Sequence, residues 1–278
     1  MSFKIQKLSS FSDGQSGGNP AGVVIDTYLP STAQMQKIAA EVGFSETAFA
    51  MPENGSWRVK YFSPESEVPF CGHATIALGA ALAEQHGDGE FQLKLNSADI
   101  SVSGVKSGNL VKASLQSPPT QSEPAKPSLI KEILKLFGYT EHDLDKTIPI
   151  GHAQAGATHI IIALNSREKL ARMNYDLNTG RELMNAHDLV TIAFIFSETP
   201  QVFHVRNAFA SGGVVEDPAT GAAAAALAGY LRDIDWPHNG AVTLIQGEDM
   251  GLRSIINMEI PSALGTSIRV SGTVRPLT

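Results

Sequence analysis

The sequence predicts an α+β fold made of two similar halves. Two segments, Phe-Cys-Gly-His-Ala-Thr at 70–75 and Glu-Asp-Pro-Ala-Thr-Gly at 216–221, each open a run of small and apolar residues typical of a buried helix. They lie about half of the 278-residue chain apart. Strand-like segments flank both, without the regular strand–helix alternation of a parallel sheet. We therefore expect a duplicated architecture in which mostly antiparallel strands surround a central helix in each half.

The first half contains alternating apolar segments and two helical patterns. Ser31 and Thr32 offer N-cap chemistry before apolar residues at helical spacing, which predicts a helix over 31–42. The segment 71–85 is apolar nearly all round and predicts a buried helix. Gly, Asn and Pro make 13–20 a loop. Period-2 alternation and short apolar runs predict strands at 3–9, 21–25, 44–50, 57–62, 91–95, 99–105 and 110–115.

The second half follows a Pro-rich segment, 117–127, which contains four prolines and is expected to be a linker. Helices are expected at 128–137, 181–186 and 217–232. Strands are expected at 158–164, 190–196, 202–207, 241–246, 254–259 and 266–274. We expect an N-terminal domain at 1–117, completed by 266–278, and a C-terminal domain at 128–265.

Composition excludes several classes of function. A net charge of −7 without any Lys/Arg block argues against nucleic-acid binding. The sequence has no apolar run of about 18 residues, so we expect no membrane-spanning helix. The N-terminus lacks the long apolar segment of a secretory signal. The one cysteine, Cys71, cannot form an intramolecular disulfide, which suits a cytoplasmic protein. No His, Cys and carboxylate cluster has metal-ligand spacing, and His152 and His159 are expected to be structural.

Polar residues gather at the two expected helix starts. Asp217 before Pro218 is a favoured N-cap, so capping alone explains it as well as catalysis does. Backbone N–H groups of Thr220 and Gly221 at a positive dipole end could hold a carboxylate or an oxyanion.

The first helix start offers a glycine and two side chains. Gly72 permits close approach of a ligand. His73 is either an acid/base near neutral pH or a hydrogen-bonded structural histidine. Cys71 is either a small buried hydrophobe or a nucleophile or base.

Glu46 is a carboxylate in an apolar, strand-like segment. Period-2 alternation places it on one face with Phe44 and Ala48. Desolvation by such neighbours favours the protonated form and would bring the group into the range useful for moving protons. A solvent-facing edge glutamate is the alternative.

Four motifs occur together in the order found in one known family: 19–23 (Asn-Pro-Ala-Gly-Val), 43–49 (Gly-Phe-Ser-Glu-Thr-Ala-Phe), 70–75 (Phe-Cys-Gly-His-Ala-Thr) and 215–221 (Val-Glu-Asp-Pro-Ala-Thr-Gly). Arg206-Asn207 and the segment 246–251 (Gln-Gly-Glu-Asp-Met-Gly) add to the set. With these motifs the chain resembles the PhzF family of phenazine biosynthesis-like proteins, in the diaminopimelate epimerase-like superfamily.

The resemblance implies two domains, each a barrel-like sheet around a central helix, with the active site in the cleft between them. It implies isomerisation of a small carboxylate-bearing substrate by proton transfer, without metal or organic cofactor, in a homodimer. Glu46 would be the acid/base and His73 and Asp217 its catalytic partners. The substrate-binding residues that the resemblance implies are Asn19, Gly72, Thr220 and Gly221.

The presence of a single cysteine excludes a reaction that needs two thiols of one chain. Epimerases of this superfamily use two thiols, one at each helix start, whereas this chain has Cys71 at the first and Asp217 at the second. The chain also departs from the family pattern at Ala222, where serine is frequent, and at Leu252, where an Arg-Pro-Ser begins. Two alternatives to the isomerase stay open: a single-thiol racemase or epimerase using Cys71, and a non-catalytic small-molecule binding protein.

Overall fold

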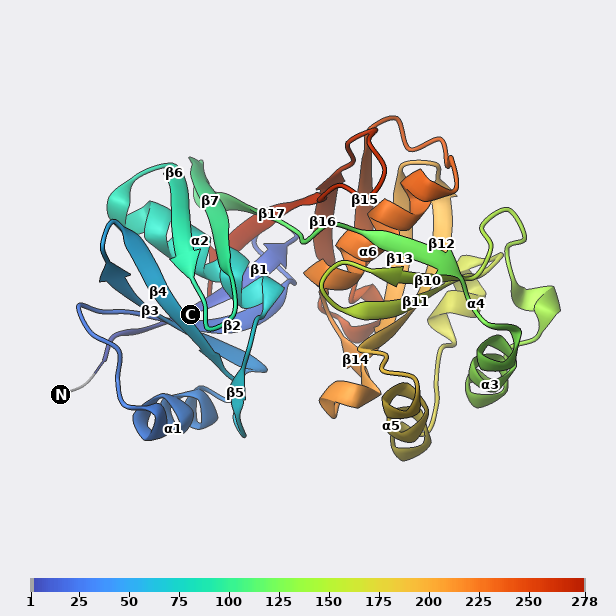
Figure 1. Cartoon of the computed structure of the whole chain (residues 1–278), viewed down its shortest axis with the longest axis horizontal. Coiled ribbons are helices and arrows are strands. Elements are labelled where there is room, and N and C mark those ends of the chain that lie inside the picture. Colours follow the sequence, from blue (N-terminus) through green and yellow to red (C-terminus); the bar gives the residue numbers. More distant parts are fainter. Residues whose placement is uncertain (1–2, 278) are drawn as a thin grey trace. The chain divides into compact units, whose positions relative to one another are not determined.

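Each of the two small-residue helices is buried among strands of its own half in the computed structural model, which describes residues 3–277 (Figure 1). Helix α2 (Gly72–His86) has every residue from 73 to 83 buried. Helix α6 (Gly221–Asp233) buries nearly all of its length. The chain divides into unit 1 (Met1–Gln116 and Ser271–Thr278) and unit 2 (Ser117–Val270).

Unit 1 arranges its strands around α2. Its elements are β1 (Ile5–Ser12), β2 (Asn19–Ile25), α1 (Thr32–Val42), β3 (Glu46–Glu53), β4 (Ser56–Phe62), β5 (Glu67–Val68), α2, β6 (Gly89–Lys94), β7 (Asp99–Ser107), β8 (Leu110–Gln116) and most of β17 (Arg269–Pro276). The pairings run β1–β2–β3–β4–β6–β7–β8, and β17 pairs with both β8 and β1. This pairing closes a ring, the barrel-like arrangement that the sequence predicted.

Unit 2 arranges its strands around α6. Its elements are β9 (Gln121–Pro124), α3 (Pro127–Phe137), β10 (Gly151–Gln154), β11 (Thr158–Ala163), α4 (Arg167–Ala171), α5 (Leu177–Ala186), β12 (Thr191–Thr199), β13 (Val202–Ala208), β14 (Glu216–Asp217), α6, β15 (Ala241–Gln246) and β16 (Ser254–Glu259). Helices α3 and α5 pack an apolar face onto a core that includes Ile133, Met184 and Phe194.

The strand pairings repeat between the units. In unit 1, β1–β2 is antiparallel, β2–β3 parallel, β3–β4 and β4–β5 antiparallel, β4–β6 parallel and β6–β7 antiparallel. In unit 2 the same series runs through β10–β11, β11–β12, β12–β13, β13–β14, β13–β15 and β15–β16. The predicted duplication is therefore present in the backbone, and it equates β5 with β14 and α2 with α6.

Most predicted elements are confirmed within a few residues, and two are wrong. The segment 117–127 is no free linker, because β9 lies within it and pairs with β10, while Pro127 opens α3 at a position where its missing N–H costs nothing. Helix α6 begins at Gly221 rather than at Asp217, because Asp217 pairs with Asn207 as part of β14. The short elements β5, β10, α4 and β14 were not predicted.

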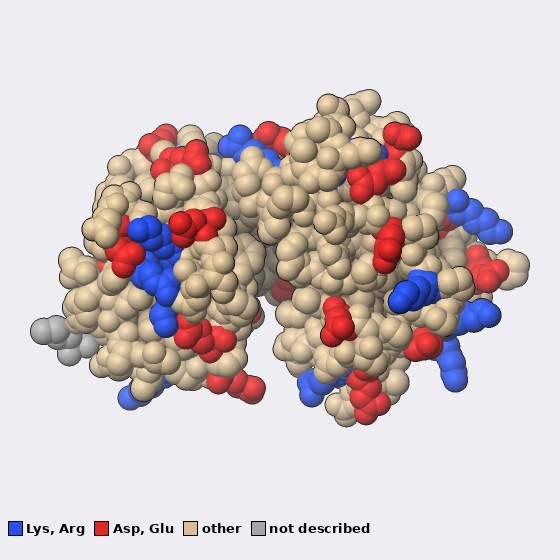
Figure 2. Space-filling model, in the orientation of Figure 1, with Lys and Arg blue, Asp and Glu red and all other residues tan. Residues whose placement is uncertain are grey.

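The surface of the protein shows no large patch of a single charge on the face drawn in Figure 2. On the face drawn in Figure 2, basic and acidic side chains are interspersed over both units. No helix within residues 3–277 is long and apolar enough to span a lipid bilayer.

Helix α2 approaches the sheet closely at two glycines. A Cβ on Gly104 of β7 would lie 2.5 Å from the Gly79 carbonyl oxygen and 2.7 Å from the Ala83 Cβ. Gly89, the register partner of Gly104 on β6, has nothing within 4 Å of such an atom. The face of α2 that lies against β7 therefore needs small residues such as Gly79 and Ala83.

We predict that Gly104→Ala lowers the free energy of unfolding by about 1–3 kcal/mol, because the added methyl overlaps the helix backbone. Urea denaturation measures the loss as a lower midpoint at unchanged slope. The matched control is Gly89→Ala, which should stay within about 0.5 kcal/mol of wild type. Equal effects of the two substitutions would contradict the packing argument.

His159 is a buried histidine of unit 2, in keeping with the structural role predicted for it. Its Nδ1 lies 2.7 Å from the Thr191 hydroxyl. Burial, with a smaller contribution from nearby His152, lowers the pKa of His159 to about 3. His152 Nδ1 lies 3.5 Å from the Glu123 carboxylate.

The low pKa of His159 predicts acid sensitivity of the fold. Between about pH 6.5 and pH 3 the unfolded chain binds a proton at this imidazole and the folded chain does not, so stability falls as the pH falls. The group contributes at most about 1.4 kcal/mol per pH unit. His159→Gln should flatten the pH dependence of the unfolding free energy in this window. The same substitution at exposed His142 should leave the slope unchanged, and equal slopes in all three proteins would overturn the assignment.

Candidate active site

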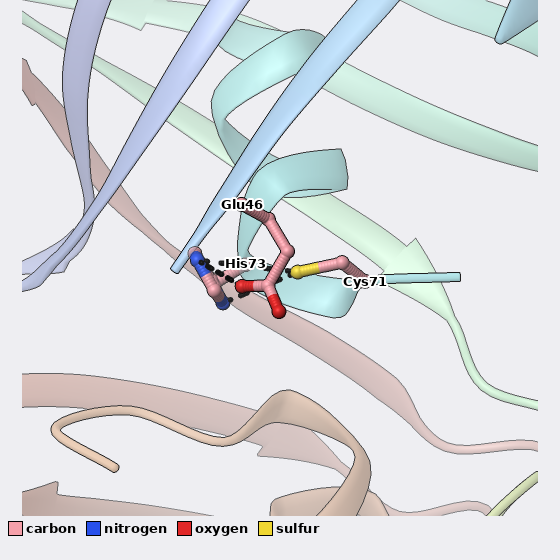
Figure 3. A group of neighbouring side chains, drawn as sticks. All are labelled: Glu46, Cys71 and His73. Carbon is pink, nitrogen blue, oxygen red and sulfur yellow. Dashed lines mark hydrogen bonds and ion pairs between the residues drawn. The ribbon is translucent and has the colours of Figure 1, made fainter. Parts of the chain in front are cut away.

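Glu46, Cys71 and His73 form a cluster at the start of α2 (Figure 3). Glu46 is the first residue of β3, Cys71 is the N-cap of α2 and His73 is its second residue. His73 Nε2 lies 3.4 Å from Glu46 Oε2, and His73 Nδ1 lies 3.3 Å from Cys71 Sγ. The imidazole therefore joins the thiol and the carboxylate through its two different nitrogens.

The cluster is largely shielded from solvent. The side chains of His73 and Glu46 are 7% and 18% exposed. The Ser45 hydroxyl also lies 3.4 Å from His73 Nε2. Phe44 precedes β3, so its predicted place on one strand face with Glu46 is wrong, and the semi-buried setting of Glu46 comes from the fold around it.

Strands β1 and β2 hold the backbone of this cluster. The Ser10 hydroxyl donates to the His73 carbonyl at 2.7 Å. Asn19, 2% exposed, is the register partner of Ser10 on β2. Ala21 on the same strand is the parallel partner of Glu46. Asn19 thus pairs with β1, whose Ser10 binds the His73 backbone, and it is two residues from Ala21, the partner of Glu46.

A second set of bonds fixes the first turn of α2. The Thr75 hydroxyl donates to the Cys71 carbonyl at 2.7 Å and is also bonded to the Tyr61 hydroxyl at 2.7 Å. Burial raises the pKa of Tyr61 well above its usual range, so its hydroxyl stays protonated. The position of the Cys71 backbone is therefore defined by two buried hydroxyls.

The three side chains could also supply metal ligands. One ligand atom from each of Glu46, Cys71 and His73 lies within 4.8 Å of the other two. His73 Nε2 lies 3.9 Å from Cys71 Sγ, a separation that two ligands of one ion can have. The sequence argument against a metal cluster missed this group because Glu46 is distant from Cys71 along the chain.

In unit 2, Asp217 lies at the end of β14, before the start of α6. Its carboxylate accepts a hydrogen bond from the Thr220 hydroxyl, and its carbonyl accepts from Gln246 Nε2 at 2.7 Å. Thr220, not Asp217, is the N-cap residue of α6, and its side chain makes no capping bond. The N-cap role predicted for Asp217 is wrong, because backbone pairing with Asn207 holds it in extended structure.

The duplicated topology also corrects the predicted counterpart of Cys71. Cys71 and Thr220 are the N-caps of α2 and α6, and each follows its two-residue strand at the same distance. Thr220, rather than Asp217, is therefore the internal counterpart of Cys71.

A buried ion pair anchors β14 beside Asp217. Arg206 binds Glu216 through Nε, 3.1 Å from both carboxylate oxygens, and through a second guanidinium nitrogen. Arg206 also donates to the carbonyls of Ala171 and Met173. This bidentate pair holds the strand that carries Asp217.

Each predicted site residue lies at one of these two clusters. Gly72 and Gly221 are the first residues of the two helices. The site residues that sequence reasoning did not single out are Ser10, Ser45, Asn207 and Gln246. Ser45, Asn207 and Gln246 belong to the motifs at 43–49, around 206 and at 246–251, which were the available signal, whereas Ser10 lies in none of them.

Comparison with known proteins places the chain in a family. The family model described as phenazine biosynthesis-like protein matches residues 8–275. The chain belongs to this family. Trans-2,3-dihydro-3-hydroxyanthranilate isomerase of Pseudomonas fluorescens is 30% identical over 254 residues, covering 90% of this chain and 87% of the relative. An uncharacterized isomerase of Mesorhizobium japonicum is 31% identical over 287 residues, with coverage of 94% and 92%. The protein is accordingly an isomerase.

Solved structures agree on the fold. A phenazine biosynthesis protein of the PhzF family from Bacillus anthracis has a TM-score of 0.87 at 22% identity, covering 100% of this chain and 98% of that chain. A hydroxyproline epimerase from Agrobacterium vitis has a TM-score of 0.61 at 10% identity, with coverage of 100% and 91%. The chain thus shares its fold with a PhzF-family protein and with a hydroxyproline epimerase.

Proposed function

We propose that this isomerase moves a proton within a small, unsaturated, carboxylate-bearing substrate, with Glu46 as the general acid/base. The observation that carries the proposal is the contact between Glu46 and His73 in a mostly buried cluster at the start of α2. A carboxylate that is mostly shielded from solvent and lies beside an imidazole suits proton transfer to and from carbon.

The proposed reaction balances without a co-reactant. The Glu46 carboxylate removes a proton from one carbon of a conjugated system as the C–H bond breaks. The electron pair shifts the double bonds, and the carboxyl group returns the proton to another carbon. Neither oxidation nor reduction occurs, so no organic cofactor or metal is required.

The helix starts supply the proposed anion contacts. Neither Cys71 nor Thr220 caps its own helix through its side chain. The N–H groups of the first turns, beginning at Gly72 and Gly221, can therefore bind the substrate carboxylate and the negative charge that develops beside it. We propose Asp217, before the start of α6, as a further catalytic residue.

The relative from Pseudomonas fluorescens indicates the class of substrate, an unsaturated ring carboxylate. We do not propose its named compound for this chain. Ala222, the second residue of α6, lacks the hydroxyl frequent in the family, and Leu252 replaces a basic motif start. These changes alter the groups available to the rest of the substrate. Assembly as a homodimer and a cytoplasmic location stay predictions.

We predict that Glu46→Gln lowers turnover by roughly 100- to 10,000-fold, the range typical of general acid–base catalysis. The test is deuterium incorporation, by mass spectrometry, into a panel of small unsaturated and amino carboxylic acids in heavy water. The amide keeps the size of the side chain but cannot accept a proton from carbon.

The matched control for this prediction is Glu53→Gln, the same substitution at the other end of β3. Glu53 is 34% exposed and pairs with Lys94 at 3.8 Å, outside the cluster. Its variant should exchange at the wild-type rate. Wild-type exchange in Glu46→Gln would refute the assignment, and ligand binding without exchange in wild type would favour a binding protein.

A single-thiol racemase or epimerase is the second candidate, favoured by the 3.3 Å contact between Cys71 Sγ and His73 Nδ1. In that reaction Cys71 would be one of two bases and Glu46 or Asp217 the other. Under the leading proposal Cys71→Ser lowers turnover by less than about tenfold, because the thiol does not exchange protons with carbon. A loss as large as that of Glu46→Gln, with the substrate α-proton as the exchanging atom, would favour the epimerase instead.

A further inference from the structure

We propose that Thr220 is a positioning residue for Asp217, and that Asn207 and Gln246 fix the direction in which its hydroxyl donates. The inference rests on the proposed function, in which Asp217 contacts the substrate. Under this proposal the hydroxyl and the N–H of Thr220 do not contact the substrate, contrary to the sequence-based prediction. Asn207 and Gln246 act on Asp217 indirectly, through Thr220.

The hydrogen-bonding capacity of the Thr220 hydroxyl is fully used inside the protein. Its oxygen accepts from Asn207 Nδ2 at 2.6 Å and from Gln246 Nε2 at 3.1 Å. A hydroxyl has two acceptor lone pairs and one proton. With both lone pairs occupied, the proton goes to Asp217. This bond holds the Asp217 carboxylate in one rotamer.

The backbone of Thr220 is fixed by the same partner. The Thr220 N–H donates to Gln246 Oε1 at 3.3 Å, while Gln246 Nε2 also donates to the Asp217 carbonyl. Gln246 is 1% exposed. One buried amide thus clamps both ends of the turn between β14 and α6.

Asn207 carries a cost that a purely structural role does not explain. It is fully buried, and its Oδ1 has no hydrogen-bond partner. A buried acceptor without a hydrogen-bond partner is unfavourable, because it loses its bonds to water and gains none in the protein. The opposite amide orientation would let Oδ1 accept the Thr220 proton, and Asp217 would lose it. The observed orientation keeps the donor on Thr220 and so preserves the bond to Asp217.

The duplicated topology supports the assignment. Thr220 occupies the place that Cys71 holds in unit 1, the N-cap of the small-residue helix. Cys71 contacts the imidazole of His73. The hydroxyl of Thr220 contacts a carboxylate instead, and its proton is committed to that carboxylate. The second helix start has therefore exchanged a reactive side chain for one that orients a charged neighbour.

The test compares Thr220→Val, which keeps the side-chain shape without the hydroxyl, with Thr220→Ser, which keeps the hydroxyl. We expect Thr220→Val to lower kcat about 10- to 100-fold with KM changed less than about threefold, since a misplaced catalytic group loses rate in this range. Thr220→Ser should restore kcat to within about threefold of wild type. The exchange assay described for Glu46 gives both constants once a substrate is identified.

The control is Thr243→Val on β15, whose hydroxyl bonds to Asn257 at 3.0 Å and does not touch Asp217. It should leave kcat unchanged. Adding Thr220→Val to Asp217→Asn should cause no further loss, because the bond then has no catalytic carboxylate to orient.

A crystal structure of Thr220→Val supplies a readout that is independent of activity. The proposal expects the Asp217 carboxylate to leave its wild-type rotamer, and an unmoved carboxylate together with wild-type kcat would overturn it. If Glu46→Gln proves fully active, the proposed function fails, but the rotamer of Asp217 still decides the role of Thr220.

Discussion

The close contact between a small-residue helix and the surrounding strands is the constraint on which this structure depends. In unit 1, Gly79 and Gly104 let α2 approach β7 so closely that a methyl group on either would overlap its neighbour. In unit 2, Gly229 of α6 meets Thr120 in the same way. A helix buried along its length offers polar chemistry only at its ends, where backbone N–H groups lack helical partners. The start of each helix is accordingly where strands of the same unit bring their polar side chains.

The two helix starts share a backbone plan but carry different chemistry. Unit 1 places an imidazole between a thiol and a carboxylate, each at hydrogen-bonding distance from a different ring nitrogen. In unit 2 the Thr220 hydroxyl donates to the Asp217 carboxylate and accepts hydrogen bonds from two side-chain amides. A two-thiol racemase needs equivalent groups at both ends, whereas moving a proton within one substrate needs a single base and stabilisation of charge. The divergence between Cys71 and Thr220 fits the second reaction.

Local composition was enough to predict the two buried helices, most strands and the motifs that contain the site. What it could not predict depends on partners distant in sequence. Asp217-Pro218 has the local signature of a helix start, but pairing of Asp217 with β13 and the bond from Gln246 delay the helix to Gly221. Strand β9 was not predicted, because the prolines of 117–127 are typical of a linker and the strand is defined by its pairing with β10. The meeting of Glu46 with His73 likewise follows from the parallel pairing of β2 with β3 and the bond from Ser10.

The most direct test of a single proton-carrying carboxylate is the fate of the hydrogen that moves. A substrate deuterated at the donor carbon is converted in light water, and NMR at early conversion measures deuterium at the acceptor carbon of the product. Because Glu46 is only 18% exposed, the account predicts that part of the deuterium is retained in the product. Complete loss of deuterium to water at the earliest conversion would contradict it, since two groups, one removing and another delivering the proton, give that result.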